Sequence, residues 1–382
     1  MSLTAEQRDL RDAVRGLLAK AEAGGAAWRR LRDEVGVAGL VIPERYGGAG
    51  AGLAEACVVM AELGRALTPA PMLGSSVLAA RAVLATGDEA ACGRLLPPIA
   101  DGSVTAALAW TTQEGRWDVT EAAFTARAPG AGGAGDDAGA DAFWELDGRA
   151  HYVLDGAASG VLLAVARTPG GLGLFELDLR GGGVTRAATA VMDDSRELAV
   201  VGLAAARGRR IGGEATGPLA AARDWACVAL SAELAGAAQR ALELTVEHML
   251  TRVQFGQPIG GFQALQHRAA DLHVLVESAR SLWQAVAADG VAVSSPRAMA
   301  AKAYCSEVAT QAASEMIQLH GAIGVTWEHQ AHRYLKRAHG GRYLLGSPAR
   351  QLAAIAASLI DESLIDESLA GEAGAVGPVV ER

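Results

Sequence analysis

The chain has 382 residues, of which 51% are hydrophobic, so it is long enough to build two or three layers of structure around a large core. Its formal net charge of -9 argues against nucleic acid as the main ligand, because phosphate backbones are bound by clustered cations. The four cysteines are widely separated and form no C-x-x-C motif, which argues against a metal site or a disulfide framework.

The N-terminal sequence lacks the charged and then apolar pattern of a signal peptide, and no apolar run in the chain is long enough to span a bilayer. Thr4 and Gln7 stand in capping-box positions, so a helix is expected to begin there. We therefore expect a soluble cytoplasmic protein that does not use a membrane.

Residues 1–102 are predicted to form an N-terminal α-helical domain. Helical segments over 28–35, 51–67 and 76–86 are separated by glycine and proline. A turn with the sequence Pro43-Glu44-Arg45-Tyr46-Gly47-Gly48 lies between two of them, where glycine can supply the positive φ of a helix stop.

Residues 103–213 are predicted to form a middle β domain, because short runs rich in Val, Leu, Ala and aromatic residues alternate there with turn residues. The expected strands cover 104–110, 142–146, 152–154, 161–166 and 172–179. The glycine-rich stretch 129–137 is expected to be a mobile surface loop, and it lacks the lysine and the strand-to-helix context of a phosphate-binding loop.

Residues 214–370 are predicted to form a C-terminal helical bundle, and 371–382 a disordered tail. Ser295-Pro296 has the chemistry of a helix start, and that helix is expected to run to His320 before Gly321 ends it. Ser347-Pro348 repeats the same signal for a last long helix. The scattered histidines of this region form no H-x-x-x-H pair with an acidic partner, so no metal site is expected.

Two motifs in the bundle region carry a family resemblance. The first is Arg252-Val253-Gln254-Phe255-Gly256, continuing through Ile259 to Phe262, and the second is Gln318-Leu319-His320-Gly321-Ala322. Together they resemble the paired signature of the acyl-CoA dehydrogenase family, and the turn at 43–48 matches another mark of that family. The resemblance covers essentially the whole chain.

The resemblance implies an α+β fold with an N-terminal helical domain, a middle β-barrel-like domain and a C-terminal four-helix bundle. It also implies FAD as the cofactor. The residues expected to contact FAD are Arg252, Gln254, Phe255, Ile259, Phe262, Gln318, Gly321 and Ala322, the second motif doing so from a neighbouring subunit. An arginine suits this role because its planar fork donates two hydrogen bonds to phosphate oxygens.

Two segments of the β domain depart from the family pattern. The family's flavin-contacting loop has its counterpart in a segment containing Thr111 and Thr112, which keep hydroxyl groups for the flavin edge although the usual glycine turn is missing. A second segment, His151-Tyr152-Val153-Leu154-Asp155-Gly156, replaces the family's tryptophan-containing strand end. The second FAD motif also ends in Ala322 where the family has glycine.

The resemblance implies oxidation of an acyl thioester, such as an acyl-CoA or a carrier-bound acyl group, to its 2,3-enoyl product. A carboxylate removes the α-proton while the β-hydrogen leaves as hydride to FAD. The usual position of that carboxylate falls on Leu345, and the alternative position on Ala226, and neither side chain can accept a proton.

Glu233 lies seven residues after Ala226 and therefore within about 20° of the same helix face. Two interpretations of Glu233 stand side by side at this point. It is either the catalytic base of a pocket rearranged for a bulky acyl group, or a buried helix acid paired with an arginine elsewhere.

Three functions follow from these observations. The first is an acyl-CoA dehydrogenase that introduces a C=C bond as a homodimer or homotetramer and passes electrons to an acceptor flavoprotein. The second is a non-catalytic or half-site subunit of a heteromeric dehydrogenase, because both usual base positions are inert. The third is a flavin enzyme of the same fold turned to another reaction.

Overall fold

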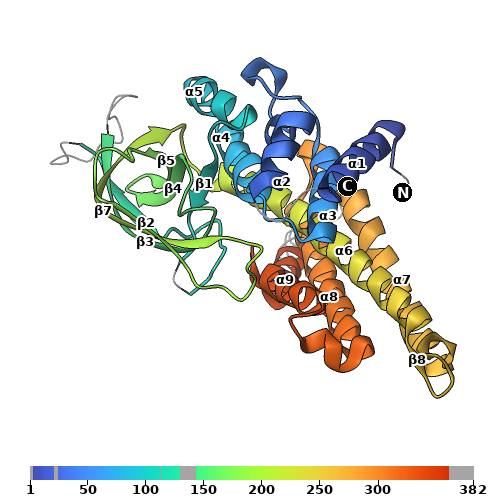
Figure 1. Ribbon diagram of the computed structural model, residues 1–382. Coiled ribbons are helices and arrows are strands. Elements are labelled where there is room, and N and C mark those ends of the chain that lie inside the picture. The colour runs from blue at the N-terminus through green and yellow to red at the C-terminus, as the bar shows by residue number, and fades with distance from the viewer. Residues whose placement is uncertain (1–2, 21–24, 113, 130–142, 361–382) are drawn as a thin grey trace, which may run out of the picture.

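The computed structural model describes residues 3–20, 25–112, 114–129 and 143–360. Helices at the two ends of the chain pack together, and a β-barrel projects to one side of them (Figure 1). The α+β architecture expected from the sequence is confirmed. Most of the stretch 129–137 and the whole tail 371–382 lie outside the described residues. Within the described residues, no helix is long and apolar enough to span a membrane.

The N-terminal region is helical. Its helices are α1 (Ala5–Leu18), α2 (Gly25–Arg30), η1 (Leu31–Val35), η2 (Val37–Gly39), η3 (Glu44–Tyr46), α3 (Leu53–Ala66), η4 (Met72–Ala79), α4 (Ala80–Ala85) and α5 (Glu89–Ala100). The capping box at the start of α1 is present, since the backbone N–H of Gln7 donates to Thr4 Oγ1 and the backbone N–H of Thr4 donates to Gln7 Oε1. The turn at 43–48 ends with Gly47 at φ 84°.

The described residues of the middle region form seven strands. They are β1 (Ala106–Ala109), β2 (Phe124–Arg127), β3 (Phe143–Leu154), β4 (Val161–Thr168), β5 (Gly171–Leu177), β6 (Val184–Ala188) and β7 (Leu198–Ile211). The pairings β2–β3, β3–β7, β7–β5, β5–β4 and β4–β2 return to their starting strand, so the sheet closes into a barrel. Trp144, Phe124 and Phe175 fill its interior.

The structure corrects two details of the expected strands. The runs at 142–146 and 152–154 belong to one strand, β3, whose polar middle at Asp147, Gly148 and Arg149 resembles a turn in the sequence but stays paired with β7 through irregular register. Strands β2, β6 and β7 were not expected, and β6 is exposed along almost its whole length, which removes the apolar alternation that marks a strand.

The C-terminal region is the bundle. Its elements are α6 (Thr216–Thr251), the hairpin β8 (Val253–Gln254) and β9 (Gln257–Pro258), η5 (Ile259–Gly261), α7 (Gln263–Ala287), η6 (Gly290–Ala292), α8 (Ser295–His320), η7 (Gly321–Val325) and α9 (Ala331–Tyr343). Residues 348–360 are also helical. Helix α8 ends at His320 as expected, but Ser294 is its N-cap, while the hydroxyl of Ser295 donates to Asp224.

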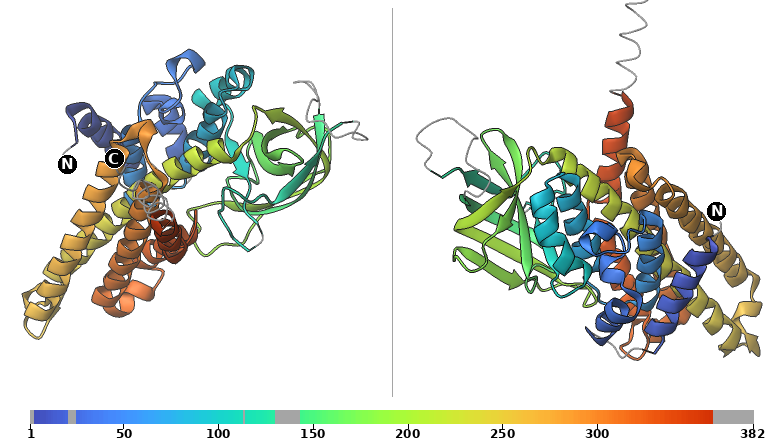
Figure 2. Two further views of the ribbon diagram at one scale, coloured as in Figure 1. Left: turned by 180° about the vertical axis from the view of Figure 1, so that it is seen from behind. Right: turned by 90° about the horizontal axis from the view of Figure 1, so that it is seen from above.

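Helix α6 is the central element of the molecule, as the two views in Figure 2 make clear. It packs against α3 and η4 of the N-terminal region and against α7, α8 and α9 of the bundle. Its residues 225–235 are almost all buried, because both sides of the helix face other helices. One apolar core therefore joins the two helical regions.

Candidate functional site

A pocket of about 640 Å³ lies between the β-barrel and the C-terminal end of α9. From the barrel side it is lined by Glu114, Gly115, Trp117, Tyr152, Val191, Met192, Asp193, Arg196 and Leu198, and from the bundle side by His339, Gly340, Tyr343, Leu344, Ser347 and Arg350. Its volume is within the range of small-molecule sites, and most of its wall is apolar or aromatic.

Three segments that the sequence analysis singled out meet at this pocket. They are the segment after Thr111 and Thr112, the segment 151–156 and the turn 344–347. The first two are joined directly, because the backbone N–H of His151 donates to the carbonyl of Thr111 at 3.0 Å. These three segments, which lie far apart along the chain, form part of the pocket wall, whereas the segments 191–198 and 339–343 that complete it were not singled out from the sequence.

Trp117 forms a rigid part of the wall. Its ring makes an edge-to-face contact with Trp110, with 5.2 Å between the ring centroids. Trp110 is buried and its indole N–H donates to the carbonyl of Asp118 at 3.0 Å. This pair fixes the apolar surface of the pocket on the barrel side.

The residues of the first FAD motif lie at the far tip of the bundle, on the hairpin between α6 and α7 (Figure 1). Arg252, Gln254 and Phe255 are exposed, and Phe255 is 92% exposed. Ile259 and Phe262 are half-buried. The guanidinium of Arg252 forms no hydrogen bond or ion pair with any residue in the described ranges, so its donors are available to a ligand.

The second FAD motif lies at the same end of the bundle. Gln318, Gly321 and Ala322 are all exposed. Three histidine rings pack together beside the two motifs. The ring centroids of His248 and His320 are 4.3 Å apart, and those of His320 and His329 are also 4.3 Å apart. Burial lowers the pKa of all three histidines, and their mutual proximity adds to the effect. The stack is therefore favoured in its neutral form.

The pocket and the two FAD motifs are separated within one chain. The motif end lies next to the first residue of α9, whereas the pocket is lined by the last residues of that helix. Because α9 has 13 residues, the two regions are about 20 Å apart along its axis. Thr111 and Thr112, which lie beside the pocket, therefore do not share one site with Arg252 or Gln318 in a single chain.

The two usual positions of a catalytic carboxylate are apolar and buried. Leu345 is 2% exposed and adopts a φ of 59°, and its carbonyl accepts a hydrogen bond from Gln351 Nε2 at 3.0 Å. Ala226 is fully buried in α6. Leu344 presents its side chain to the pocket from the same turn.

Glu233 is 1% exposed and forms ion pairs with two arginines. Its Oε1 lies 2.5 Å from Arg196 Nη2 and 2.6 Å from Arg337 Nε. This geometry matches the second interpretation of Glu233, in which the carboxylate is a buried partner of arginine. Glu233 is also not among the residues that line the pocket.

The arginines that bind Glu233 extend into a buried polar network. Arg337 Nη1 donates to the carbonyl and the hydroxyl of Ser195, both at 3.0 Å, and lies 3.5 Å from Asp193 Oδ2. Burial raises the pKa of Asp193, but Arg337 and the hydroxyl of Ser195 outweigh this and lower it. The network connects the barrel to α6 and α9.

The sequence analysis did not identify Arg196, Arg337, Asp193 or Asp155. Arg196 and Arg337 become partners of Glu233, and Asp193 a partner of Arg337, only through folding, since 193–196, Glu233 and Arg337 lie far apart along the chain. Asp155 lies beside the same network, and burial raises its pKa to about 7. The clustered charges of Asp193-Asp194-Ser195-Arg196 were the one signal available in the sequence.

The polar groups beside the pocket and at the bundle tip are of the kinds that can hold a flavin cofactor. Beside the pocket, the imidazole Nε2 of His151 is buried without a hydrogen-bond partner in the part of the chain that the structure describes. At the tip, Arg252 offers free donors and Phe255 an exposed ring. Ala322 is exposed, so its methyl group leaves the approach to this end open.

Two models of known protein families match the two helical regions of the chain. The model for "Acyl-CoA dehydrogenase, N-terminal domain" matches residues 4–103, and the model for "Acyl-CoA dehydrogenase, C-terminal domain" matches residues 222–360. The acyl-CoA dehydrogenase IpdE2 of Mycobacterium tuberculosis is 39% identical over 366 residues, covering 91% of this chain and 95% of that protein.

Two solved structures are similar over nearly the whole chain. A variant of the Tcur3481-Tcur3483 steroid ACAD has a TM-score of 0.82 and 28% identity, and it covers 94% of this chain and 99% of that one. The ChsE4-ChsE5 complex from Mycobacterium tuberculosis has a TM-score of 0.82 and 26% identity, and it covers 94% of this chain and 98% of that one.

Proposed function

Because the chain belongs to the acyl-CoA dehydrogenase family, and is thus an oxidoreductase acting on CH-CH groups, we propose that it is the subunit without a catalytic carboxylate in a heteromeric, FAD-dependent enzyme. The observation that carries this proposal is the occupation of both base positions by the buried apolar residues Leu345 and Ala226. The ion pairing of Glu233 supports it, because that carboxylate is already engaged by two guanidinium groups.

The other carboxylates of the pocket are also poor candidates for the base. Asp193 accepts from the hydroxyl of Ser195 at 2.5 Å and is ion-paired with Arg337. Glu114 is exposed, and a hydrogen bond from Thr112 lowers its pKa. A general base needs a carboxylate that is free to reach the α-proton in a water-poor site. A second chain would supply it in our proposal.

The distance between the two groups of expected cofactor residues also supports a partner chain. Thr111, Thr112, His151 and Tyr152 would hold the flavin ring against the barrel. Arg252, Gln254, Phe255 and Gln318, about one helix length away, would reach a cofactor held by the neighbouring chain. Both similar structures named above are themselves described by two component names, which agrees with such an assembly.

When bound, FAD supplies the acceptor for the hydride that leaves the β-carbon. The chain itself would contribute the walls of the site. Trp117 and Leu344 would exclude water from the reacting carbons, which strengthens the electrostatic interactions of the incoming carboxylate. An acceptor flavoprotein is the proposed partner that takes up the electrons from the assembled enzyme.

We also propose that the acyl group is bulky. The pocket of about 640 Å³ is wide, and Trp117, Tyr152, Met192 and Tyr343 give it broad apolar surfaces rather than a narrow channel. The similar structure described as a steroid ACAD agrees with this choice. A ring-bearing acyl-CoA should therefore reduce the flavin of the assembled enzyme faster than butyryl-CoA or octanoyl-CoA.

The test is the visible absorption spectrum and native mass of the protein, first alone and then co-expressed with a family member that has the catalytic glutamate. We expect little FAD in the protein alone, and near-stoichiometric FAD in the complex that bleaches anaerobically with an acyl-CoA. A fully flavinated homo-oligomer that bleaches without a partner would overturn the proposal and return attention to Glu233 as a base.

A further inference from the structure

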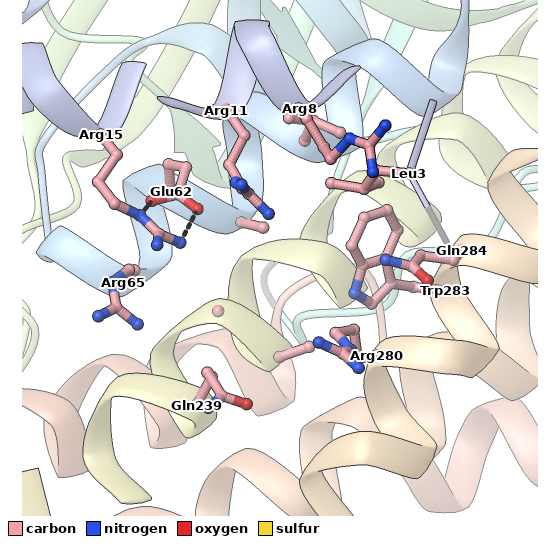
Figure 3. Close-up of a pocket in the computed structure, with 14 residues that line it drawn as sticks. Leu3, Arg8, Arg11, Arg15, Glu62, Arg65, Gln239, Arg280, Trp283 and Gln284 are labelled. Carbon is pink, nitrogen blue, oxygen red and sulfur yellow. Dashed lines mark hydrogen bonds and ion pairs between the residues drawn. The ribbon is translucent and has the colours of Figure 1, made fainter. Parts of the chain in front are cut away.

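A second pocket lies on the opposite side of α6 from the barrel, between α1, α3, α6 and α7, with a volume of about 350 Å³ (Figure 3). Its lining includes five arginines and a single acidic residue, Glu62. The arginines are Arg8, Arg11, Arg15, Arg65 and Arg280. None of the segments identified above as parts of the flavin or acyl site contributes to it.

Four of these arginines are anchored by carboxylates. Arg15 binds Glu62 through two hydrogen bonds of 2.8 and 2.6 Å. Arg65 binds Glu243 in the same bidentate way, Arg280 pairs with Glu277 and Arg11 with Asp12. These pairs hold the guanidinium groups in place, and each guanidinium has five N–H donors, so it retains donors beyond those used by its carboxylate.

Arg8 differs from the other four. Its guanidinium forms no hydrogen bond or ion pair with any residue in the described ranges, and it lies beside Leu3 at the edge of the pocket (Figure 3). Of the carboxylates that pair with the other four arginines, only Glu62 lines the pocket, and Glu243 is shared with Arg240, so positive charge is in excess around it. An anion is the complement of that arrangement, because arginine binds phosphate oxygens through paired donors.

Two glutamines of the pocket lack partners for their side-chain oxygens. Gln239 Oε1 and Gln284 Oε1 are both buried without a hydrogen bond in the described part of the chain. The orientation of Gln239 is fixed, since its Nε2 donates to Glu243 Oε1 at 3.2 Å. A buried acceptor without a donor is unfavourable, so a ligand that brings hydroxyl groups would satisfy these oxygens where an anion alone would not.

We propose that this pocket binds an organic phosphate that also carries hydroxyl groups, of about the size of a hexose phosphate. Arg8 and Arg11, which extend from α1, bind the phosphate. Gln239 and Gln284, from α6 and α7, accept hydrogen bonds from the hydroxyl groups. The ligand therefore connects the N-terminal helix to the bundle. A hexose phosphate suits the pocket volume of about 350 Å³, which is at the small end of the range for small-molecule sites.

The test is isothermal titration calorimetry of the purified protein, at constant ionic strength, with glucose 6-phosphate, glucose and inorganic phosphate. We expect saturable binding of glucose 6-phosphate, and binding of inorganic phosphate and of glucose at least about tenfold weaker. Arg8→Gln and Arg11→Gln should each lower the affinity for glucose 6-phosphate about tenfold or more. Arg149→Gln, on the outside of the barrel, is the matched control and should leave this affinity unchanged.

Gln239→Leu separates the two parts of the proposal. It removes the unpartnered acceptor while keeping a side chain of similar volume. The variant should therefore bind glucose 6-phosphate more weakly and bind inorganic phosphate with unchanged affinity. Equal affinity for glucose 6-phosphate and inorganic phosphate would overturn the role of the hydroxyl groups. No binding, or an equal loss in Arg149→Gln, would overturn the site. FAD content and flavin bleaching, measured on the same samples, test the proposed function separately, because neither depends on these residues.

Discussion

At the scale of single residues, the buried carboxylate of Glu233 is held by two ion pairs. Two guanidinium groups lie within 2.6 Å of the same oxygen, and all three side chains are almost completely buried. Removing one member of such a group leaves uncompensated charge in the interior. Glu233 is therefore expected to matter first for the attachment of the barrel to the bundle.

We predict that Glu233→Gln lowers the free energy of unfolding by about 3 kcal/mol, because Arg196 and Arg337 lose their shared anion. Urea unfolding followed by circular dichroism measures this, with Glu328→Gln at an exposed position as the control. Unchanged stability combined with loss of flavin bleaching in the assembled enzyme would instead identify Glu233 as the base.

A second prediction concerns Asp155, whose pKa burial raises to about 7 with Arg196, Glu197 and Arg337 nearby. The folded protein holds this proton more tightly than the unfolded chain, where an aspartate titrates near 3.9. Stability therefore falls as the pH rises from about 4 to about 7. Between about pH 5 and pH 8 the native protein should lose about 2 to 3 kcal/mol of unfolding free energy relative to Asp155→Asn, measured by urea unfolding of both proteins.

Equal pH dependence in the two proteins would show that Asp155 does not contribute. The acidic groups of exposed surfaces titrate in both proteins and cancel in the comparison, which makes the variant its own control for them.

At the scale of elements, the contact of α3 with α6 decides how the N-terminal helices sit on the bundle. A Cβ on Gly64 would lie 1.9 Å from the carbonyl oxygen of Glu233, and a Cβ on Gly236 would lie 2.0 Å from the carbonyl oxygen of Ala61. The two helices therefore touch backbone to backbone, and each glycine exists at this crossing because no side chain fits there.

We predict that Gly64→Ala lowers the free energy of unfolding by about 2 kcal/mol or more, because α3 must move away from α6. Gly16→Ala is the matched control, since a Cβ at this exposed position of α1 meets nothing within 4 Å. The free energy of unfolding of that variant should rise by about 0.5 to 1 kcal/mol, because alanine has the higher helix propensity. Similar effects of the two substitutions on thermal unfolding would contradict the close crossing.

Elements with local signals were predictable from the sequence, whereas contacts between them were not. The capping residues Thr4 and Gln7 and the stop at Gly321 act within a few residues, so the start of α1 and the end of α8 follow from the chain itself. The strand β3 was divided in the prediction because Asp147-Gly148-Arg149 has turn composition, and only pairing with β7 keeps it extended. The partners of Glu233 needed the folded structure for the same reason.

At the scale of the whole molecule, the FAD motifs and the pocket lie at opposite ends of α9. The motif end of the bundle exposes large apolar side chains at Phe255, Trp327, Val325, Leu250 and Val253. An apolar surface of this kind usually marks an interface with another chain. The separation of the FAD motifs from the pocket, on which the proposed division of the site between chains rests, depends on the folded structure and could not be predicted from the sequence.

We predict that Phe255→Ser leaves the thermal unfolding of the isolated chain within about 1 kcal/mol of the native protein, because the ring is 92% exposed. In the co-expressed complex the same variant should reduce the FAD content, measured as absorbance of the bound flavin per protein. Normal flavin content in that complex would place the cofactor elsewhere. Val274→Ser, an exposed position on α7, is the control for a change of surface polarity.

If the site is divided between chains as proposed, the distance of about one helix between the pocket and the motif end makes the activity depend on protein concentration. In the proposed assembly, each cofactor is retained by contacts from two chains, so dissociation of the chains and release of flavin are linked by mass action. Dilution would then lower the specific activity of the enzyme, and added FAD would restore it by drawing the chains back together.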